Sequence, residues 1–200
     1  HLSIRRQRQM CIRDRDGDGP PKGTWRTNFG YGGIDSRTLV NNGELEVYVD
    51  SRFSGTSVNS LNLDPFRIVD GKVELVAEPL KPDLRQFAWG RSYSSGLLTN
   101  RGSFAQQYGL FEIRAKVPKG KGLWPAFWLL PANRAWPPEL DVLEILGDNP
   151  RKLYVSWHSN VGGTHSSETK AIDVPDTSED FHTYSVMWTK DVIEWFFDDI

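Results

Sequence analysis

Three carboxylic acids lie within the segment 139–146, whose sequence is ELDVLEIL. Glu139 and Asp141 alternate with aliphatic residues, as in a β-strand, where successive side chains point to opposite faces. Glu144 breaks this alternation, and a regular strand would bury its lone carboxylate among aliphatic side chains, which is costly. A β-bulge near residues 142–143 would add one residue, return Glu144 to the face of the other acids and turn the next aliphatic residue to the core. The segment therefore predicts a bulged strand that gathers its acids on one face.

A short amphipathic helix is the alternative interpretation of the same segment. Pro137 and Pro138 would begin such a helix, with Glu139 and Asp141 in an acid-rich first turn. The stretch between the flanking prolines would make only about two helical turns, whereas its length is ordinary for a strand. The strand is therefore the favoured interpretation.

The spacing of the two glutamates suits hydrolysis of a glycosidic bond. With the bulge, Glu139 and Glu144 stand roughly four strand steps apart, which is about 13 Å at ~3.3 Å per residue. Leaning side chains would bring their carboxyl groups to roughly 5 to 6 Å, the separation of a retaining glycosidase. Neighbouring carboxylates cannot all ionise freely, so the pKa of one must rise, which supplies a proton donor beside a nucleophile.

The acids and a second motif together resemble one enzyme family. The Glu-x-Asp-x-x-Glu pattern follows the segment 122–131, GLWPAFWLLP, as in the bulged-strand branch of glycoside hydrolase family 16, which includes laminarinases, licheninases, agarases and carrageenases. The resemblance spans residues 23–200 and includes the segments 95–99, 108–115 and 180–198. It implies an all-β fold, a concanavalin-like jelly roll, which is an antiparallel β-sandwich with a carbohydrate cleft on its concave face.

The resemblance also implies a role for each acid. Family members that match this motif carry the nucleophile, an assisting acid and the acid/base in this chain order, which implies these roles for Glu139, Asp141 and Glu144. In that chemistry the nucleophile attacks the anomeric carbon. The acid/base protonates the leaving oxygen and then deprotonates the incoming water.

Four further residues are candidates for substrate binding. Trp124 opens the Trp-Pro motif and Trp136 lies just before the first acid, positions that resemble family residues on the non-reducing side of the cleft, although either could be a core residue. His158 follows the acidic strand by one hairpin and is expected to meet the central acid or the substrate across the sheet, or to be purely structural. Asn42 matches a family asparagine that contacts sugar hydroxyls, or it is simply a turn residue.

No metal or cofactor is expected to take part in catalysis. His158 and His165 have no cysteine or third histidine at ligand spacing, which argues against a zinc site, and His165 is interpreted as a loop residue. Hydrolysis between two carboxylates requires no cofactor. Some family members carry a structural calcium, so such an ion is compatible with this chain.

Composition and patterning indicate a single all-β domain. The chain has 200 residues, a net charge of -2 and eight tryptophans. This length suits one large sandwich, the charge argues against a nucleic-acid partner, and aromatic faces are suited to stacking on sugar rings. Turn and alternation signals predict a hairpin turn at 41–43, a loop at 50–62, a hairpin over 66–77 around Asp70-Gly71, an end of sheet register at Pro79 and Pro82, and strands over 44–49, 97–100, 108–117, 126–130, 140–146, 154–158, 183–188 and 192–197.

Residues 1–22 are predicted to lie outside the domain, which is expected to span residues 23–200. This leader is rich in arginine, lacks the apolar region of a signal peptide or a membrane span, and resembles translated sequencing-adapter sequence. It contains the sole cysteine, Cys11, so no disulfide framework is expected. The segment 14–19 matches the opening of an EF-hand calcium loop, but position twelve would be Trp25, which cannot ligate calcium. The domain is expected to be truncated at its C-terminus, because family members continue with further strands.

Together these features predict a secreted or periplasmic retaining endo-β-glucanase. The tryptophan-rich approach to the acids looks more like laminarinases than like agarases or carrageenases, so the expected substrate is a β-1,3-containing glucan, such as laminarin or mixed-linkage glucan. Transglycosylation shares the same chemistry, and the sequence does not separate it from hydrolysis. A non-catalytic β-glucan-binding domain is a further alternative, but such relatives lack one or both glutamates. The protein is expected to be a monomer whose partner is the polysaccharide, with no nucleic-acid or membrane partner.

Overall fold

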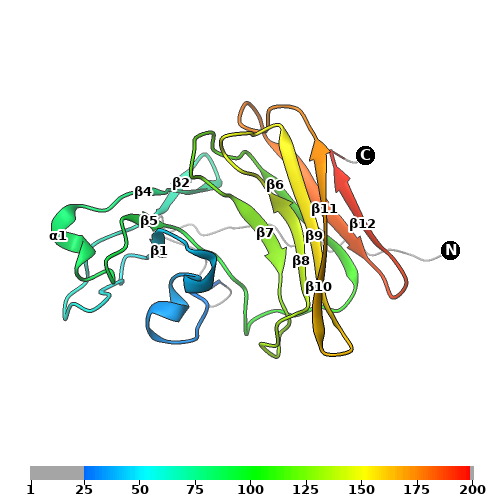
Figure 1. Ribbon diagram of the computed structural model, residues 1–200. Coiled ribbons are helices and arrows are strands. Elements are labelled where there is room, and N and C mark those ends of the chain that lie inside the picture. Colours follow the sequence, from blue (N-terminus) through cyan, green and yellow to red (C-terminus); the bar gives the residue numbers. More distant parts are fainter. Residues whose placement is uncertain (1–24, 199–200) are drawn as a thin grey trace. The chain divides into compact units, whose positions relative to one another are not determined.

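The computed structural model describes residues 25–198, which form two compact units, residues 25–105 and 106–198 (Figure 1). Each unit is described by itself below. The leader at 1–22, with the EF-hand-like segment 14–19 and Cys11, lies outside the described residues. Within the described part of the chain, no helix has both the length and the apolar character needed to cross a membrane.

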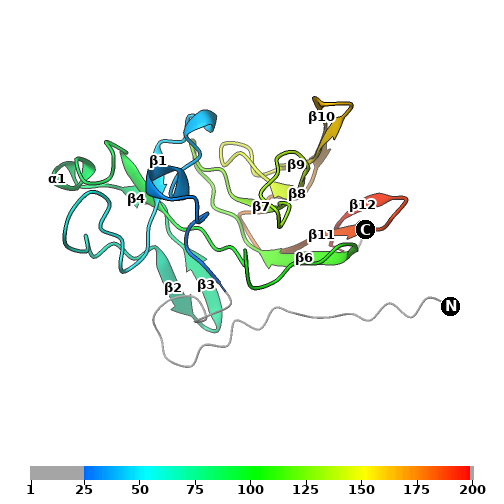
Figure 2. The ribbon, with the colours of Figure 1, turned by 90° about the horizontal axis from the view of Figure 1, so that it is seen from below.

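The C-terminal unit is an antiparallel β-sandwich of two sheets. One sheet has the strand order β10-β9-β8-β7 and the other has the order β12-β11-β6, and Figure 2 shows them as separate layers. The predicted all-β, antiparallel fold class is therefore confirmed. The strands are β6 (Gly109–Ala115), β7 (Ala126–Leu129), β8 (Glu139–Glu144), β9 (Lys152–Val161), β10 (Thr164–Asp173), β11 (His182–Trp188) and β12 (Ile193–Phe197).

A hydrophobic core between these two sheets holds the acidic strand in place. Strand β8 and the residue after it contribute several of the buried side chains, which pack with residues of β9 and β11. Apolar side chains of β6, β7 and β12 complete this core, which explains the continuous apolar runs in β7 and β12. The buried members are Val117, Leu140, Val142, Leu143, Ile145, Leu153, Val155, Tyr184 and Val186.

The N-terminal unit has smaller sheets and short helical turns around its own core. Its sheets have the orders β1-β5-β4 and β2-β3. Strands β1 and β5 pair in parallel, which is feasible because a long stretch of chain between them returns to the same end of the sheet. The elements are η1 (Gly33–Ser36), η2 (Val40–Asn42), β1 (Glu46–Tyr48), β2 (Phe66–Val69), β3 (Lys72–Leu75), β4 (Glu78–Pro79), α1 (Pro82–Arg85) and β5 (Tyr93–Ser95). The core residues are Val47, Val49, Phe53, Leu80 and Ala88.

The predicted hairpin around Asp70-Gly71 is confirmed. Strands β2 and β3 are antiparallel, with Val69 opposite Lys72. Asp70 and Gly71 both have positive φ, 49° and 72°. This is the conformation that a two-residue turn needs if it is to match the right-handed twist of its strands.

The predicted hairpin turn at 41–43 is wrong. Val40–Asn42 forms the 3-10 helix η2, and Gly43 ends it in the left-handed conformation with φ 69°. Strand β1, which follows, pairs with β5, far along the chain. An Asn-Gly pair suits any turn that needs positive φ, so the pattern did not distinguish a helix cap from a hairpin.

Two strand boundaries in the N-terminal unit also differ from prediction. Pro79 lies within β4 and pairs with Tyr93 of β5, rather than ending the sheet. Strand β4 is an edge strand of its sheet, where a residue without an N–H can be accommodated. The strand expected at 97–100 lies earlier, at β5, and Thr99 makes only an isolated bridge to Arg26.

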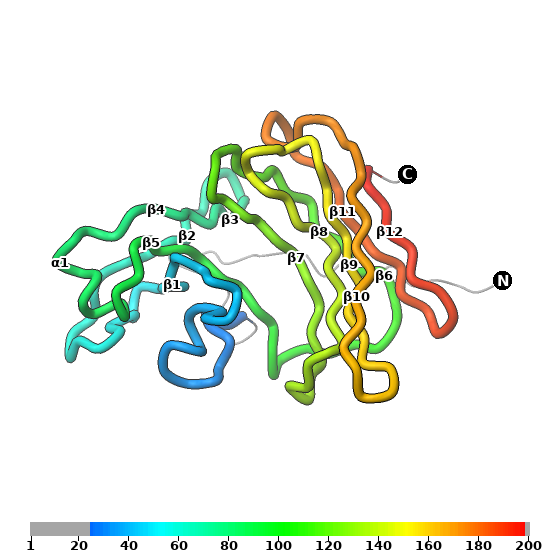
Figure 3. The backbone as a smooth tube through the Cα atoms, in the orientation of Figure 1, coloured from blue at the N-terminus to red at the C-terminus, as the bar shows by residue number. Residues whose placement is uncertain are grey.

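Strand β10 was not predicted at all. It pairs with β9 along its whole length, and Figure 3 follows the two strands side by side from yellow to orange. Every residue of β10 is exposed, and its sequence, THSSETKAID, has no apolar alternation. An edge strand that buries neither face lacks the pattern by which strands are found in a sequence.

Candidate active site

The predicted β-bulge is present in β8. Between Asp141 and Glu144 the strand advances by three residues, while the paired strand β9 advances by two, from Ser156 to Tyr154. The register with β7 shifts at the same place. One extra residue of β8 is therefore accommodated next to Asp141, as the sequence predicts.

The bulge places the acids on one face of the sheet. Directly opposite residues of an antiparallel pair share a face, and the β9 partners of the acids are spaced two residues apart, so they also share one face. The residue after the bulged segment, Ile145, has no exposed surface and packs in the core, as predicted. The opposite pairs are Glu139–His158, Asp141–Ser156 and Glu144–Tyr154.

Asp141 is the most enclosed of the acids. Its residue surface is 3% exposed, whereas Glu139 and Glu144 are half-buried. Burial raises the pKa of Asp141 to about 8, and the charges of Glu139 and Glu144 raise it further, together with a hydrogen bond to Glu139, while Ser156 opposes the rise. The prediction that one pKa of this cluster must rise is confirmed. Asp141 therefore holds its proton near neutral pH, between two glutamates.

The pKa of Glu144 is also raised above its usual range. Burial is the main cause, the charge of Glu139 adds to it, and a hydrogen bond from Trp124 works in the opposite direction. A carboxyl group that keeps its proton longer than usual is suited to donate that proton to a leaving oxygen.

The two candidate tryptophans are both at the surface. Trp124 and Trp136 are each 55% exposed, so neither is a core residue. The indole Nε1–H of Trp136 donates a hydrogen bond to Glu139 Oε2. Each tryptophan therefore lies beside one of the two glutamates and leaves much of its ring open to solvent.

His158 faces Asp141, as expected from its place on the neighbouring strand. Its Nε2 lies 3.3 Å from Asp141 Oδ2, and in the sheet register it is opposite Glu139. Atoms of Glu139, Asp141 and His158 lie within 4.8 Å of one another, a spacing that could hold a metal ion. The sequence argument against zinc counted only cysteines and histidines, so this mixed group escaped it.

Two residues next to the acids were missed. His165 was interpreted as a loop residue, but it lies in β10, and its Nε2 is 3.1 Å from His158 Nδ1. Trp195, in β12 of the other sheet, donates its Nε1–H to the backbone oxygen of Asp141 at 2.9 Å and so fixes the chain at the bulge. No sequence signal marks either contact, because both depend on how the strands pair and how the sheets pack.

The remaining predicted site residue, Asn42, lies in the N-terminal unit. It ends η2 and is exposed, and its role in contacting sugar hydroxyls stays a prediction.

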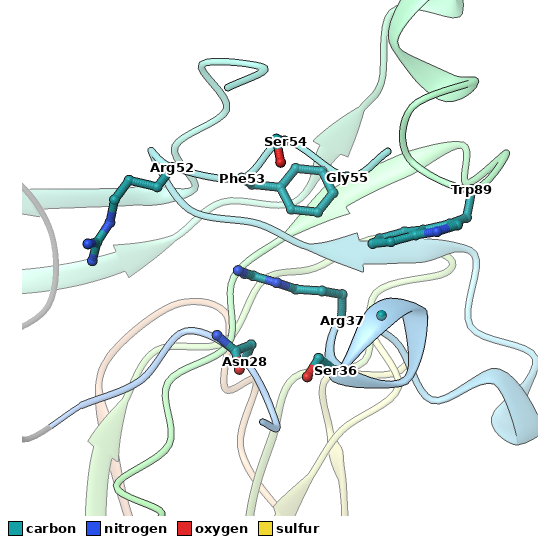
Figure 4. A pocket seen from close by; sticks show the side chains of 9 residues that line it. Asn28, Ser36, Arg37, Arg52, Phe53, Ser54, Gly55 and Trp89 are labelled. Atoms are coloured by element: carbon teal, nitrogen blue, oxygen red, sulfur yellow. The ribbon is translucent and has the colours of Figure 1, made fainter. Parts of the chain in front are cut away.

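The same N-terminal unit has a hollow that Figure 4 shows from close by. The side chain of Arg37 lies there with its guanidinium carbon 5.4 Å from the centre of the Phe53 ring, and its Nη1 is 2.8 Å from Asp50 Oδ2. The described residues that line the hollow include no carboxylic acid, so it does not offer the acid chemistry of β8.

A β-sandwich with two glutamates and an aspartate on one face of a bulged strand defines a class, the β-sandwich glycosyl hydrolases. The model of one family within this class, glycosyl hydrolases family 16, matches residues 36–200. The chain belongs to that family.

Comparison with known proteins places the chain near glucanases. It is 41% identical over 177 residues to endo-1,3-1,4-beta-glycanase EglC of Rhizobium meliloti (strain 1021), covering 88% of this chain and 37% of EglC. The solved catalytic domain of an endo-1,3-beta-glucanase (laminarinase) from Thermotoga petrophila RKU-1 has a TM-score of 0.69 at 33% identity, covering 93% of this chain and 71% of that one. The laminarinase from Rhodothermus marinus has a TM-score of 0.69 at 30% identity, with coverages of 92% and 68%. The chain thus spans well under half the length of the curated relative EglC.

Proposed function

We propose that this chain carries the catalytic site of a retaining, endo-acting glycoside hydrolase that cleaves β-1,3-containing glucans. The observation that carries the proposal is the bulged strand β8, which brings Glu139, Asp141 and Glu144 to one face. A pair of carboxyl groups with different environments is what double displacement at a glycosidic bond requires.

In the proposed reaction Glu139 is the nucleophile. It attacks the anomeric carbon and forms a covalent glycosyl-enzyme while Glu144 gives its proton to the leaving glycosidic oxygen. Glu144, now a carboxylate, then takes a proton from water, which attacks the same carbon and releases the sugar with its original configuration. Asp141 assists: it shares a hydrogen bond with Glu139, so it can steady the charge of the nucleophile before attack and after release.

The proposed substrates are laminarin and mixed-linkage β-glucan. The exposed rings of Trp124 and Trp136, each beside one glutamate, would stack on sugar rings on either side of the reacting bond. The names of EglC and of the two solved laminarinases support a β-1,3-containing glucan. A polymeric glucan lies outside cells, so we also propose a secreted or periplasmic location, a monomeric state and catalysis without a cofactor, with room for a structural calcium ion.

Two other functions remain as alternatives to test. The first is another specificity of the family, namely an agarase, a carrageenase or a transglycosylase, because the double displacement is the same in each. The second is a non-catalytic β-glucan-binding domain. The presence of all three acids argues against a purely binding role.

The test is a panel of polysaccharides assayed for new reducing ends, with laminarin, barley β-glucan, agarose and carrageenan as substrates and cellulose as a control. Hydrolysis of the first two is expected. Glu139→Gln and Glu144→Gln should each lower the rate by at least about 1000-fold, because each removes half of the double displacement. Binding of laminarin without any new reducing ends would instead support the binding domain, and activity on agarose alone would move the specificity to a galactan.

A further inference from the structure

His165 lies at the end of a chain of polar contacts that begins at the buried acid. Asp141 Oδ2 is 3.3 Å from His158 Nε2, and His158 Nδ1 is 3.1 Å from His165 Nε2. The two imidazole rings stack nearly parallel, with centroids 5.4 Å apart and planes inclined by 11°. His158 thus has one nitrogen directed at Asp141 and the other at His165.

Strand β10 presents His165 on the same face of the sheet as the acids. In the register with β9, Thr169 is opposite Ser156, which is itself opposite Asp141. Thr169 Oγ1 and Ser156 Oγ are 2.9 Å apart, so this face continues from β8 through β9 to β10. His165 is four residues from Thr169 and therefore shares its face.

Trp136 closes the cluster on its open side. Its ring centroid is 4.8 Å from that of His165 and 6.1 Å from that of His158, while its Nε1–H bonds to Glu139. The ring of His165 is therefore held between a strand and an indole, and its contact with His158 has little freedom to reorient. The titratable groups that face this pair are Asp141 and Glu139, both from β8.

The hydrogen bond between the two histidines restricts where His158 carries its proton. A neutral imidazole donates from one nitrogen and accepts at the other. If His165 Nε2–H donates to His158 Nδ1, then the proton of His158 must be on Nε2, where it points at Asp141 Oδ2. This orientation gives the buried carboxyl oxygen a donor, and the proton of Asp141 itself stays available for Glu139. A second residue that selects the tautomer of a functional histidine is a recurring arrangement.

We propose that His165 is a positioning residue that holds His158 as its Nε2–H tautomer, so that His158 donates to Asp141 while Asp141 pairs with Glu139. This inference rests on the proposed function for its effect on catalysis. The tautomer of His158, however, can be measured without any substrate, so the two ideas can fail separately.

The experiment compares two substitutions that remove different properties of His165 in the full chain. His165→Phe keeps an aromatic ring against Trp136 and His158 but cannot hydrogen-bond. His165→Gln loses the ring but keeps an N–H that can donate to His158 Nδ1. Ser166→Ala is the matched control, because Ser166 is the next residue of β10 and points to the opposite face.

The first readout is the ¹⁵N NMR pattern of the imidazoles, with His158 assigned by its loss in His158→Gln. Wild type, Ser166→Ala and His165→Gln should show His158 protonated at Nε2 alone, and His165→Phe should show a mixture of tautomers. His182, whose Nδ1 is 2.7 Å from Asp198 Oδ2 in the other sheet, is an internal reference that should not change. A wild-type His158 protonated at Nδ1, or the same single tautomer in His165→Phe, would overturn the proposal.

The second readout separates kcat from KM on laminarin. Losing one hydrogen bond in the cluster should lower kcat of His165→Phe by about 3- to 10-fold, with little change in KM, while His165→Gln and Ser166→Ala should stay near wild type. A rise in KM with unchanged kcat would show that His165 contacts sugar instead. Equal losses in His165→Phe and His165→Gln, together with a lower melting temperature, would show a structural role and contradict the proposal.

Discussion

Replacing Asp141 by asparagine is expected to stabilise the protein increasingly as pH rises, although it impairs the site. Asp141 is 3% exposed, and its pKa is raised to about 8, first by burial and then by the charges of Glu139 and Glu144. A folded-state pKa above the unfolded value means that the folded state binds its proton more tightly. The stability that this proton brings is fully present below about pH 4, where the unfolded chain is also protonated, and is lost as pH rises through about 8.

The size of the effect follows from the pKa shift. A rise of about four units corresponds to at most about 5 kcal/mol of unfolding free energy lost between pH 4 and pH 8. The nearby His158 Nε2, 3.3 Å from Asp141 Oδ2, can stabilise the ionised carboxyl group and reduce this loss. Because asparagine does not ionise, the unfolding free energy of Asp141→Asn relative to wild type should increase by about 2 to 5 kcal/mol over this range and level off above it.

The assay is urea unfolding of both proteins at a series of pH values, followed by tryptophan fluorescence. Asp50→Asn provides a control of opposite sign. Burial alone would raise the pKa of Asp50, but hydrogen bonds from Thr27 and Arg37 outweigh it, and its pKa is lowered. Its contribution is therefore present above the usual carboxyl pKa and lost as pH falls, so Asp50→Asn should be destabilising at neutral pH and less so in acid. A stability difference for Asp141→Asn that does not vary with pH would refute the assigned environment of Asp141.

The remaining predictions concern the reaction. Azide or formate should rescue Glu139→Ala and give a product of inverted configuration, because the small anion enters where the nucleophile was; no rescue would remove Glu139 from that role. Trp124→Ala and Trp136→Ala should fold normally, since both rings are 55% exposed, and should weaken productive binding of long substrates by about 1 to 3 kcal/mol; outright unfolding would show a core role. NMR of the first product formed from a β-glucan should detect the β-anomer, and an initial α-anomer would contradict retention. EDTA should leave the rate unchanged, and a loss of activity restored by a divalent metal would show that the Glu139, Asp141 and His158 group binds an ion that catalysis needs.

The bulged strand could be predicted because a local conflict demanded it. Alternation placed Glu139 and Asp141 on one face and Glu144 on the other, and burying a lone carboxylate costs more than adding one residue to a strand. The hairpin at Asp70-Gly71 was equally local, since two residues with positive φ decide it. In both cases the energetic choice is made by residues that are neighbours in the sequence.

The tertiary structure decided what depends on pairing between distant segments. His165 reaches His158 only because β10, a polar edge strand with no apolar pattern, pairs with β9. Trp195 reaches the backbone of Asp141 only because two sheets pack face to face. The sequence showed that one carboxyl group must keep its proton, but which one depends on how deeply each is buried and on the neighbours that surround it. Burial and cross-strand contacts are properties of the packed sandwich, so the sequence determined the acids and their strand, and the packing decided how their protons are shared.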